Sequence, residues 1–312
     1  AAVPAAASVA VTTVQDGVAA VDRMGFPISI KADGLASGKG VVVALNRAEA
    51  VEAIEACLAD RRFGAAGDTV LIEEGLVGPE VSLLAVCDGT RVVRFPAARD
   101  YKPIGDGNTG PNTGGMGSVS PIPDVPDALA DELVEQVHRP VVAEMARRGT
   151  PFTGVLYAGL MMTADGPRVL EFNTRFGDPE TQALLPRVDG DLAGLLEAAA
   201  HGELPDTPFA ISDDPAVTVV LASEGYPAAP VTGDRIEGLA EAGRIADVYH
   251  AGTAPGEDGG DVTAGRRVLA VSARGASVAD APAAAYRAAD AIRFRGMQRR
   301  SDIAARIDGA AS

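Results

Sequence analysis

The sequence predicts a mixed α+β and α/β protein with two α+β subdomains followed by a smaller C-terminal α+β domain. First, short β-branched runs that pair through Gly-containing turns alternate with amphipathic helical runs. Second, 312 residues exceed the length of one ordinary domain. Third, an apolar fraction of 47% and a charged fraction of 22% are typical of a globular chain with a full core.

The first 98 residues alternate between the two element types. Apolar residues at helical spacing predict helices, Gly25 and Pro27 end the first of them, and β-branched runs predict strands. The expected helices are 13–24 and 47–62, and the expected strands are 27–33, 40–46, 68–76, 80–89 and 91–98. We expect two hairpins here, one joined by the Gly-rich loop after residue 33 and one joined at Asp88-Gly89.

The rest of the chain begins with an aperiodic stretch, 99–126, that is rich in Gly, Pro, Asn and Thr, and we expect a functional loop there. Next we expect a helical region over 127–149 that is divided by Pro140, and a hairpin of 153–166 and 167–176. Helices over 178–186 and 191–202 follow, and then three strands in 216–275 and a helix over 277–292. The predicted domains are a linker 1–12, subdomains 13–78 and 79–204, and a separate C-terminal domain 205–312.

Charge and hydropathy exclude several protein classes. The net charge is −16, from 27 basic and 43 acidic residues, which argues against a general nucleic-acid binder. No apolar run approaches the length of a membrane span. Cys57 and Cys87 stand apart from any metal or disulfide pattern and predict buried thiols in the cytoplasm. The three histidines show no nucleophile motif nearby, and we interpret them as structural.

The basic residues contain only three lysines, and all three lie in or beside Gly-rich segments. In IKADGLASGKG, residues 30–40, Lys31 lies at the end of the expected strand and Lys39 lies in the loop that follows. Gly34 and Gly38 have the wrong spacing for a phosphate-binding P-loop, and a Gly follows Lys39 where that motif needs a hydroxyl. The segment is either a plain hairpin turn or a Gly-rich flap whose two ammonium groups contact phosphate.

The segment EFNTRF predicts a cluster of polar side chains on one face of a strand. Glu171, Asn173 and Arg175 alternate along it, so two oxygen donors and a guanidinium point the same way. Such a set suits a magnesium ion that carries a phosphate. The alternative is a polar strand edge facing solvent. Asp178 follows, and its simplest role is to cap the next helix.

Two further segments offer weaker signals. The glycines and the amide of TGPNTGGMG, residues 109–117, could donate to a carboxylate or phosphate, or could form a surface loop. Asp100 and Lys102 precede it and could bind substrate or form an exposed ion pair. The acids of IEEGLVGPE, residues 72–80, could lie beside adenine and ribose.

Taken together and in this order, these segments resemble the ATP-grasp ligases, and among them the phosphoribosylamine–glycine ligases. The resemblance rests on IKADGLASGKG, IEEGLVGPE, NTGPNTGGMG, TGVLYAGLM and EFNTRFGDPETQ, and it continues through EGYP, TGD, YHAGT, GRRVLAVSARG and RSDIAARI. It implies an ATP-grasp fold whose two subdomains clasp ATP. It also implies ligation of glycine to 5-phospho-β-D-ribosylamine through a glycyl phosphate in purine biosynthesis, with Mg²⁺ or Mn²⁺.

The resemblance also implies roles for residues at the matching positions. The implied ATP-binding residues are Lys31, Gly38, Lys39, Glu73, Glu74, Leu76 and Glu80, and the implied metal ligands are Glu171 and Asn173. The implied catalytic residues are Arg175, Lys39 and Asp178, and the implied glycine and phosphosugar contacts are Asp100, Lys102, Pro111, Asn112, Thr113, Gly114 and Gly115. The expected partners are these small molecules, without nucleic acid or membrane, and the chain is expected to be a monomer or weak dimer.

The sequence departs from the family pattern in two ways. Pro103 stands where a basic residue is common, and nothing here matches the family's Rossmann-like N-terminal domain. We therefore expect this chain to bind ATP but to ligate poorly without that domain. The alternatives are another ATP-grasp carboxylate–amine ligase, or an ATP-binding module that is inactive by itself.

Overall fold

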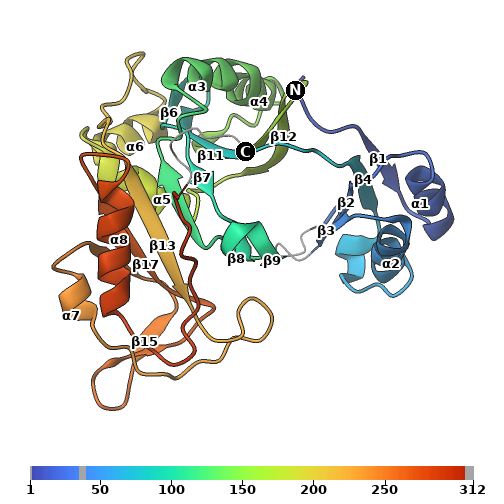
Figure 1. Cartoon of the computed structure of the whole chain (residues 1–312). Helices are drawn as coiled ribbons and strands as arrows, with labels where there is room; N and C mark the ends of the chain where they lie inside the picture. The colour runs from blue at the N-terminus through green and yellow to red at the C-terminus, as the bar shows by residue number, and fades with distance from the viewer. Residues whose placement is uncertain (1, 35–39, 306–312) are drawn as a thin grey trace. The chain divides into compact units, whose positions relative to one another are not determined.

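The computed structural model describes residues 2–34 and 40–305, which form two compact units (Figure 1). The small unit comprises Pro4–Pro79 and Met161–Leu170, and the large unit comprises the rest of the described chain. The short segment Met161–Leu170 therefore groups with residues that precede it by about eighty positions, unlike the predicted division at residue 79.

The small unit is built on a four-stranded sheet with the order β1-β4-β2-β3. Its strands are β1 Ser8–Val11, β2 Ile28–Ala32, β3 Val41–Ala44 and β4 Val70–Glu74, and its helices are α1 Val14–Val21 and α2 Arg47–Leu58. All three strand pairs are antiparallel. The predicted hairpin of β2 and β3 is confirmed, although part of the loop that joins them lies outside the described residues.

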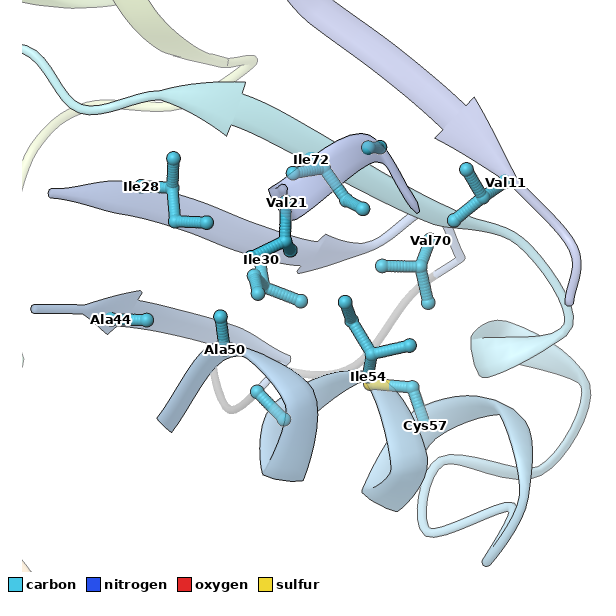
Figure 2. Packing of buried hydrophobic residues seen from close by; sticks show 12 residues of the cluster. Val11, Val21, Ile28, Ile30, Ala44, Ala50, Ile54, Cys57, Val70 and Ile72 are labelled. Carbon is cyan, nitrogen blue, oxygen red and sulfur yellow. The ribbon is translucent and has the colours of Figure 1, made fainter. Parts of the chain in front are cut away.

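Alternation along β2 and β4 gives the small unit one buried and one open face. Ile28, Ile30, Val70 and Ile72 are buried and pack with residues of α1 and α2, such as Ile54 (Figure 2). Successive side chains of a strand point to opposite faces. The intervening residues of the two strands are therefore directed away from this core.

Part of the segment 1–12, which we predicted as a linker, is a strand of the small unit. Ser8–Val11 forms β1, which pairs with β4 along its whole length, and Val11 is buried. The small and β-branched residues of SVAV carry little local signal, and the edge of β4 supplies the hydrogen-bond partners that make this segment a strand.

The large unit contains two main sheets, with the orders β14-β17-β13-β10-β7 and β12-β11-β5-β6. The strands are β5 Glu80–Asp88, β6 Val92–Arg94, β7 Arg99–Asp100, β8 Pro103–Gly105, β9 Thr109–Asn112, β10 Gly117–Ser120, β11 Thr153–Thr163, β12 Gly166–Asn173, β13 Ala216–Ala222, β14 Asp247–His250, β15 Thr253–Pro255, β16 Asp261–Thr263 and β17 Arg267–Arg274. The last residues of β11 and the first of β12 belong to the small unit.

The helices of the large unit are α3 Asp127–Leu133, α4 Arg139–Arg147, α5 Glu180–Leu184, α6 Leu192–His201, α7 Leu239–Ala242 and α8 Asp280–Ala291. Helix α8 lies along β13 and β17 (Figure 1). Its buried alanines face these strands, which explains how a helix with few large apolar residues packs closely there. Among the described residues, no helix combines the length and the apolar character that crossing a bilayer needs.

The segment 99–126 is more regular than predicted. It contains β7, β8, β9 and β10, and β10 lies between β13 and β7 in the five-stranded sheet. Strands β13, β14 and β17 of the C-terminal segment therefore share a sheet with β7 and β10, whereas we expected residues 205–312 to form a separate domain. The pairing of β10 with a strand that begins at Ala216 is a long-range interaction, so local composition does not reveal it.

The helical region over 127–149 is divided, as predicted, but the division begins before Pro140. Residues Val134–His138 form a π-helical turn between α3 and α4. His138 ends that turn and is fully buried, and neither ring nitrogen has a hydrogen-bond partner of good geometry among the described residues. Burial lowers the pKa of His138 to about 4, although the backbone of Leu83 and Leu156 opposes that shift.

We expect this histidine to make the fold sensitive to acid. Between pH 6.5 and 4 the unfolded chain binds a proton that buried His138 rejects, so stability should fall with pH by up to about 3 kcal/mol. Between pH 7.5 and pH 5, the free energy of urea unfolding should fall by about 2 kcal/mol more in the wild type than in His138→Leu. The exposed His201→Gln variant serves as control, and an equal loss of stability in His138→Leu would contradict the assignment.

Candidate functional site

The end of strand β12 brings Glu171 and Asn173 together, as the sequence predicts. The side-chain Nδ2 of Asn173 donates to Oε1 of Glu171 at 3.0 Å. The two side chains therefore lie on one face of the strand, and Glu171 is exposed. Within residues 2–34 and 40–305 no group of three or more His, Cys, Asp or Glu side chains could hold a metal ion. Two oxygen donors fit Mg²⁺, which takes few protein ligands beside phosphate oxygens and water.

Arg175 does not continue this face as part of the strand. Strand β12 ends at Asn173, and Nη1 of Arg175 donates to the carbonyl of Phe176 at 2.8 Å. The guanidinium is exposed, so it can still meet a ligand, but β12 does not set its direction.

The open face of the small unit carries Lys31. Its ammonium forms an ion pair of 2.5 Å with Glu73 and donates to the carbonyl of Leu170, the residue before Glu171, at 3.2 Å. Val41 and Val43 lie on the same face, because they pair directly with Lys31 and Ser29 in β2. They are 51% and 54% exposed, and sequence reasoning missed them.

The other implied nucleotide contacts come from several parts of the chain. Gly38 and Lys39 lie outside the described residues. The Glu74 carboxylate accepts the backbone N–H of Ala7, the residue before β1, at 3.0 Å. One of its oxygens is therefore already engaged within the small unit. Leu76 follows the end of β4 and is half-buried. Glu80 begins β5 in the large unit, where its Oε2 lies 2.8 Å from the ammonium of Lys102.

Asp100 and Lys102 form an ion pair in which Asp100 is buried and Lys102 is half-buried, whereas the alternative considered from the sequence was an exposed pair. Oδ2 of Asp100 lies 3.4 Å from the Lys102 ammonium, and the Asp100 side chain is only 6% exposed. Its Oδ1 is buried without a hydrogen-bond partner among the described residues. Burial raises the pKa of Asp100 to about 7, and nearby Glu180 adds to the rise while Lys102 opposes it.

Glu180 belongs to a buried polar cluster that sequence reasoning missed. Ser82 donates to Oε1 of Glu180 at 2.8 Å, and the hydroxyl groups of Ser82 and Tyr157 lie 3.0 Å apart. Glu180 lies within the motif EFNTRFGDPETQ, and Tyr157 lies within TGVLYAGLM. The motifs could therefore have directed attention to both.

We expect Asp100 to make the stability of the large unit depend on pH. Because its pKa is higher in the folded state than in the unfolded chain, its contribution is present below pH 4 and is lost as pH rises through about 7. The loss amounts to up to about 4 kcal/mol. As pH rises from 5 to 8, the wild type should lose more thermal stability than Asp100→Asn does, with exposed Asp165→Asn as control. If Asp100→Asn shows the same dependence of thermal stability on pH as the wild type, Asp100 is not the source of that dependence.

The predicted substrate loop does not present free backbone donors over its second half. The N–H of Gly114 donates to the Tyr226 hydroxyl at 2.8 Å, that of Gly115 donates to Thr113 Oγ1 at 2.9 Å, and that of Met116 donates to the Tyr101 carbonyl at 2.8 Å. These three N–H groups therefore already have acceptors within the protein, and substrate binding by this loop stays a prediction. Pro111 and Asn112 lie in exposed strand β9, where the Asn112 side chain can still reach a ligand.

Asp178 does not cap a helix, because α5 begins at Glu180 and Pro179 precedes it. Its Oδ1 accepts from Gln182 at 2.9 Å, and its Oδ2 accepts from Nη2 of Arg267 at 2.9 Å. Sequence reasoning also missed Arg267, although it lies within the quoted motif GRRVLAVSARG.

Comparisons with known proteins agree with this arrangement. Residues 1–181 match the family model of the phosphoribosylglycinamide synthetase ATP-grasp (A) domain, and residues 216–306 match that of the phosphoribosylglycinamide synthetase C domain. These matches confirm the predicted fold.

Relatives of known function match over nearly the whole chain. The phosphoribosylamine–glycine ligase of Streptomyces coelicolor is 50% identical over 99% of this chain and 73% of its own length. The ligase of Rhodopirellula baltica is 49% identical over 88% of this chain, which spans 64% of that relative.

Solved structures show the same relationship. The crystal structure of phosphoribosylamine–glycine ligase from Thermotoga maritima has a TM-score of 0.86 at 33% identity, covering 96% of this chain and 75% of that one. The biotin carboxylase domain of a Hydrogenobacter thermophilus 2-oxoglutarate carboxylase reaches a TM-score of 0.68 at 14% identity, covering 95% and 64%, and shares the fold alone. From its domain order, its motifs and these relatives, the chain belongs to the family of phosphoribosylamine–glycine ligases.

Proposed function

We propose that the protein joins glycine to 5-phospho-β-D-ribosylamine at the expense of ATP. The glycine carboxylate attacks the γ-phosphorus of ATP and releases ADP, and the ribosylamine nitrogen then attacks the acyl carbon of glycyl phosphate. That nitrogen loses a proton, phosphate leaves, and an amide remains. The observation that carries this proposal is the match to both domains of one ligase family. Because the chain spans only 64–73% of these two relatives, the activity of the whole protein is proposed here.

The open face of the small unit supports a role in nucleotide binding. Val41 and Val43 offer exposed apolar surface for a flat base, and the Lys31 ammonium offers a point charge for phosphate. Glu73 holds that ammonium at 2.5 Å, which limits the freedom of a long side chain before a ligand arrives. Lys39 and Gly38 complete the proposed set as a flap over the phosphates.

Glu171 and Asn173 would hold a divalent cation, Mg²⁺ or Mn²⁺, through the carboxylate and the amide oxygen. When bound, such an ion neutralises the charge that develops on a transferring phosphoryl group. The hydrogen bond from Asn173 Nδ2 to Glu171 Oε1 holds the two side chains close together, and rotation of the Asn173 amide would bring its oxygen to the cation.

The remaining proposed roles concern orientation and charge. Exposed Arg175 can stabilise the negative charge of the transferring phosphate, and Asp178, Asn112 and the Asp100–Lys102 pair would contact or orient glycine and the phosphosugar. The sequence contains no nucleophile motif, which agrees with a reaction that needs no covalent enzyme intermediate. Catalysis would then rest on positioning and electrostatic stabilisation. We propose a cytoplasmic location, as expected from the sequence.

An isotope-transfer assay tests the proposal. Glycine labelled with ¹⁸O in its carboxylate is incubated with MgATP, phosphoribosylamine and the 312-residue chain, alone and with the part of the Streptomyces coelicolor relative outside the alignment. We expect one ¹⁸O in each phosphate released, and ADP formation that needs both substrates.

The controls separate this reaction from its alternatives. β-Alanine in place of glycine tests for another carboxylate–amine ligase, and protection by MgATP against thermal unfolding tests nucleotide binding alone. Unlabelled phosphate would exclude the acyl phosphate, and ADP formation without glycine would exclude the ligase. Protection without ligation in either preparation would favour an ATP-binding module.

A further inference from the structure

One guanidinium in the C-terminal segment joins two segments of the proposed substrate site. Nη1 of Arg267 donates to the carbonyl of Gly114 at 2.6 Å and to that of Asp178 at 2.8 Å, and Nη2 donates to Oδ2 of Asp178 at 2.9 Å. The side chain is 22% exposed, so these contacts are partly shielded from water. Planar, partly desolvated guanidinium–oxygen contacts fix geometry better than a single flexible ammonium does.

A second side chain of the same segment holds Gly114 through its other backbone group. The Tyr226 hydroxyl accepts the N–H of Gly114, and Tyr226 is buried. A Cβ at Gly114 would lie 3.2 Å from Cζ of Arg267, tighter than an ordinary contact, so the guanidinium packs directly against the loop backbone. Both polar groups of this one residue are thus engaged by side chains from the C-terminal segment.

The sheet places Arg267 in register with the loop. Arg267 begins β17, β17 pairs with β13, and β13 pairs with β10, the strand that follows the loop. The N–H of Val220 in β13 also donates to the carbonyl of Met116. The loop is therefore held both through the sheet and through a side chain that crosses it.

We infer that Arg267 is a positioning residue for ligation. It holds the Gly114 region and Asp178 in one fixed arrangement, and this role rests on the proposed function of those two elements. A displacement of about 1 Å in a substrate-positioning element can lower a rate by about 100-fold. Loss of Arg267 should therefore act on the glycine and phosphosugar steps. Nucleotide contacts on the small unit should stay unchanged.

The test compares Arg267→Gln and Arg267→Lys with the matched control Arg274→Gln. Arg274 lies in the same strand and also pairs with earlier acids, Asp189 and Asp214, but its contacts do not involve the loop. Measurements use whichever preparation ligates in the isotope assay. Arg267→Gln should reduce kcat/KM for glycine by about 10- to 100-fold. The ATP concentration that gives half-maximal thermal protection should not change, and Arg267→Lys should recover part of the loss.

Amide hydrogen exchange over residues 112–118 gives a readout that does not depend on ligation. Arg267→Gln should speed exchange there, and Arg274→Gln should not. Unchanged exchange would overturn the proposed contact, and faster exchange with normal glycine kinetics would overturn the positioning role. Equal losses in glycine kinetics and ATP protection would show a general structural role and also overturn it. If the wild type exchanges as expected but ligates nothing, the proposed function fails while the loop contact stands.

Discussion

Replacing Glu171 by Gln is expected to lower turnover by about 10²–10³-fold, because it removes a negative charge where a cation and a transferring phosphoryl group are proposed to meet. The shape of the side chain is preserved, and the contact with Asn173 can persist through the remaining oxygen. The effect should therefore report on charge more than on packing. Higher Mg²⁺ or Mn²⁺ concentrations should recover part of the activity, since a weaker site still fills by mass action.

The measurement is ligation rate against metal concentration for the wild type, Glu171→Gln and Glu132→Gln. Glu132 is an exposed glutamate of α3 and serves as control for the loss of one surface charge. Glu171→Gln with an unchanged rate and unchanged metal dependence would refute the assignment of this strand end to a cation.

Replacing Lys31 by Met is expected to raise the ATP requirement by about 10- to 100-fold, the range of a hydrogen bond to a charged group. Lys31 lies in β2, which pairs with strands on both sides, so its ammonium is held by a rigid element. Lys39→Met should instead slow turnover, because a residue of the proposed flap would contribute after ATP has bound.

Steady-state kinetics in ATP for the two variants tests this division. Lys31→Met also leaves the Glu73 carboxylate without its ion-pair partner at 2.5 Å. Glu73→Gln is therefore measured as well, to separate the effect of losing the ammonium from the effect of leaving Glu73 unpaired. Equal changes of KM and kcat in Lys31→Met and Lys39→Met would contradict the division of roles.

The sequence by itself determined the features that depend on neighbours along the chain. The alternation in Ile28–Ala32 and Val70–Glu74 predicts strands with one buried face, and the i, i+2 spacing of Glu171 and Asn173 predicts their contact. The ordered motifs also predicted the family, because together they span most of the chain.

Tertiary structure alone decided the features that depend on distant residues. The stretch 99–126 has no period of its own, yet β10 is a strand because β13 supplies its hydrogen bonds about one hundred residues later. Asp100 is buried because that sheet and Glu180 surround it, and Arg267 reaches Gly114 across 153 positions. Local sequence preferences do not indicate which distant residues will pair. Sequence reasoning therefore found the proposed substrate loop but not the residues that hold it.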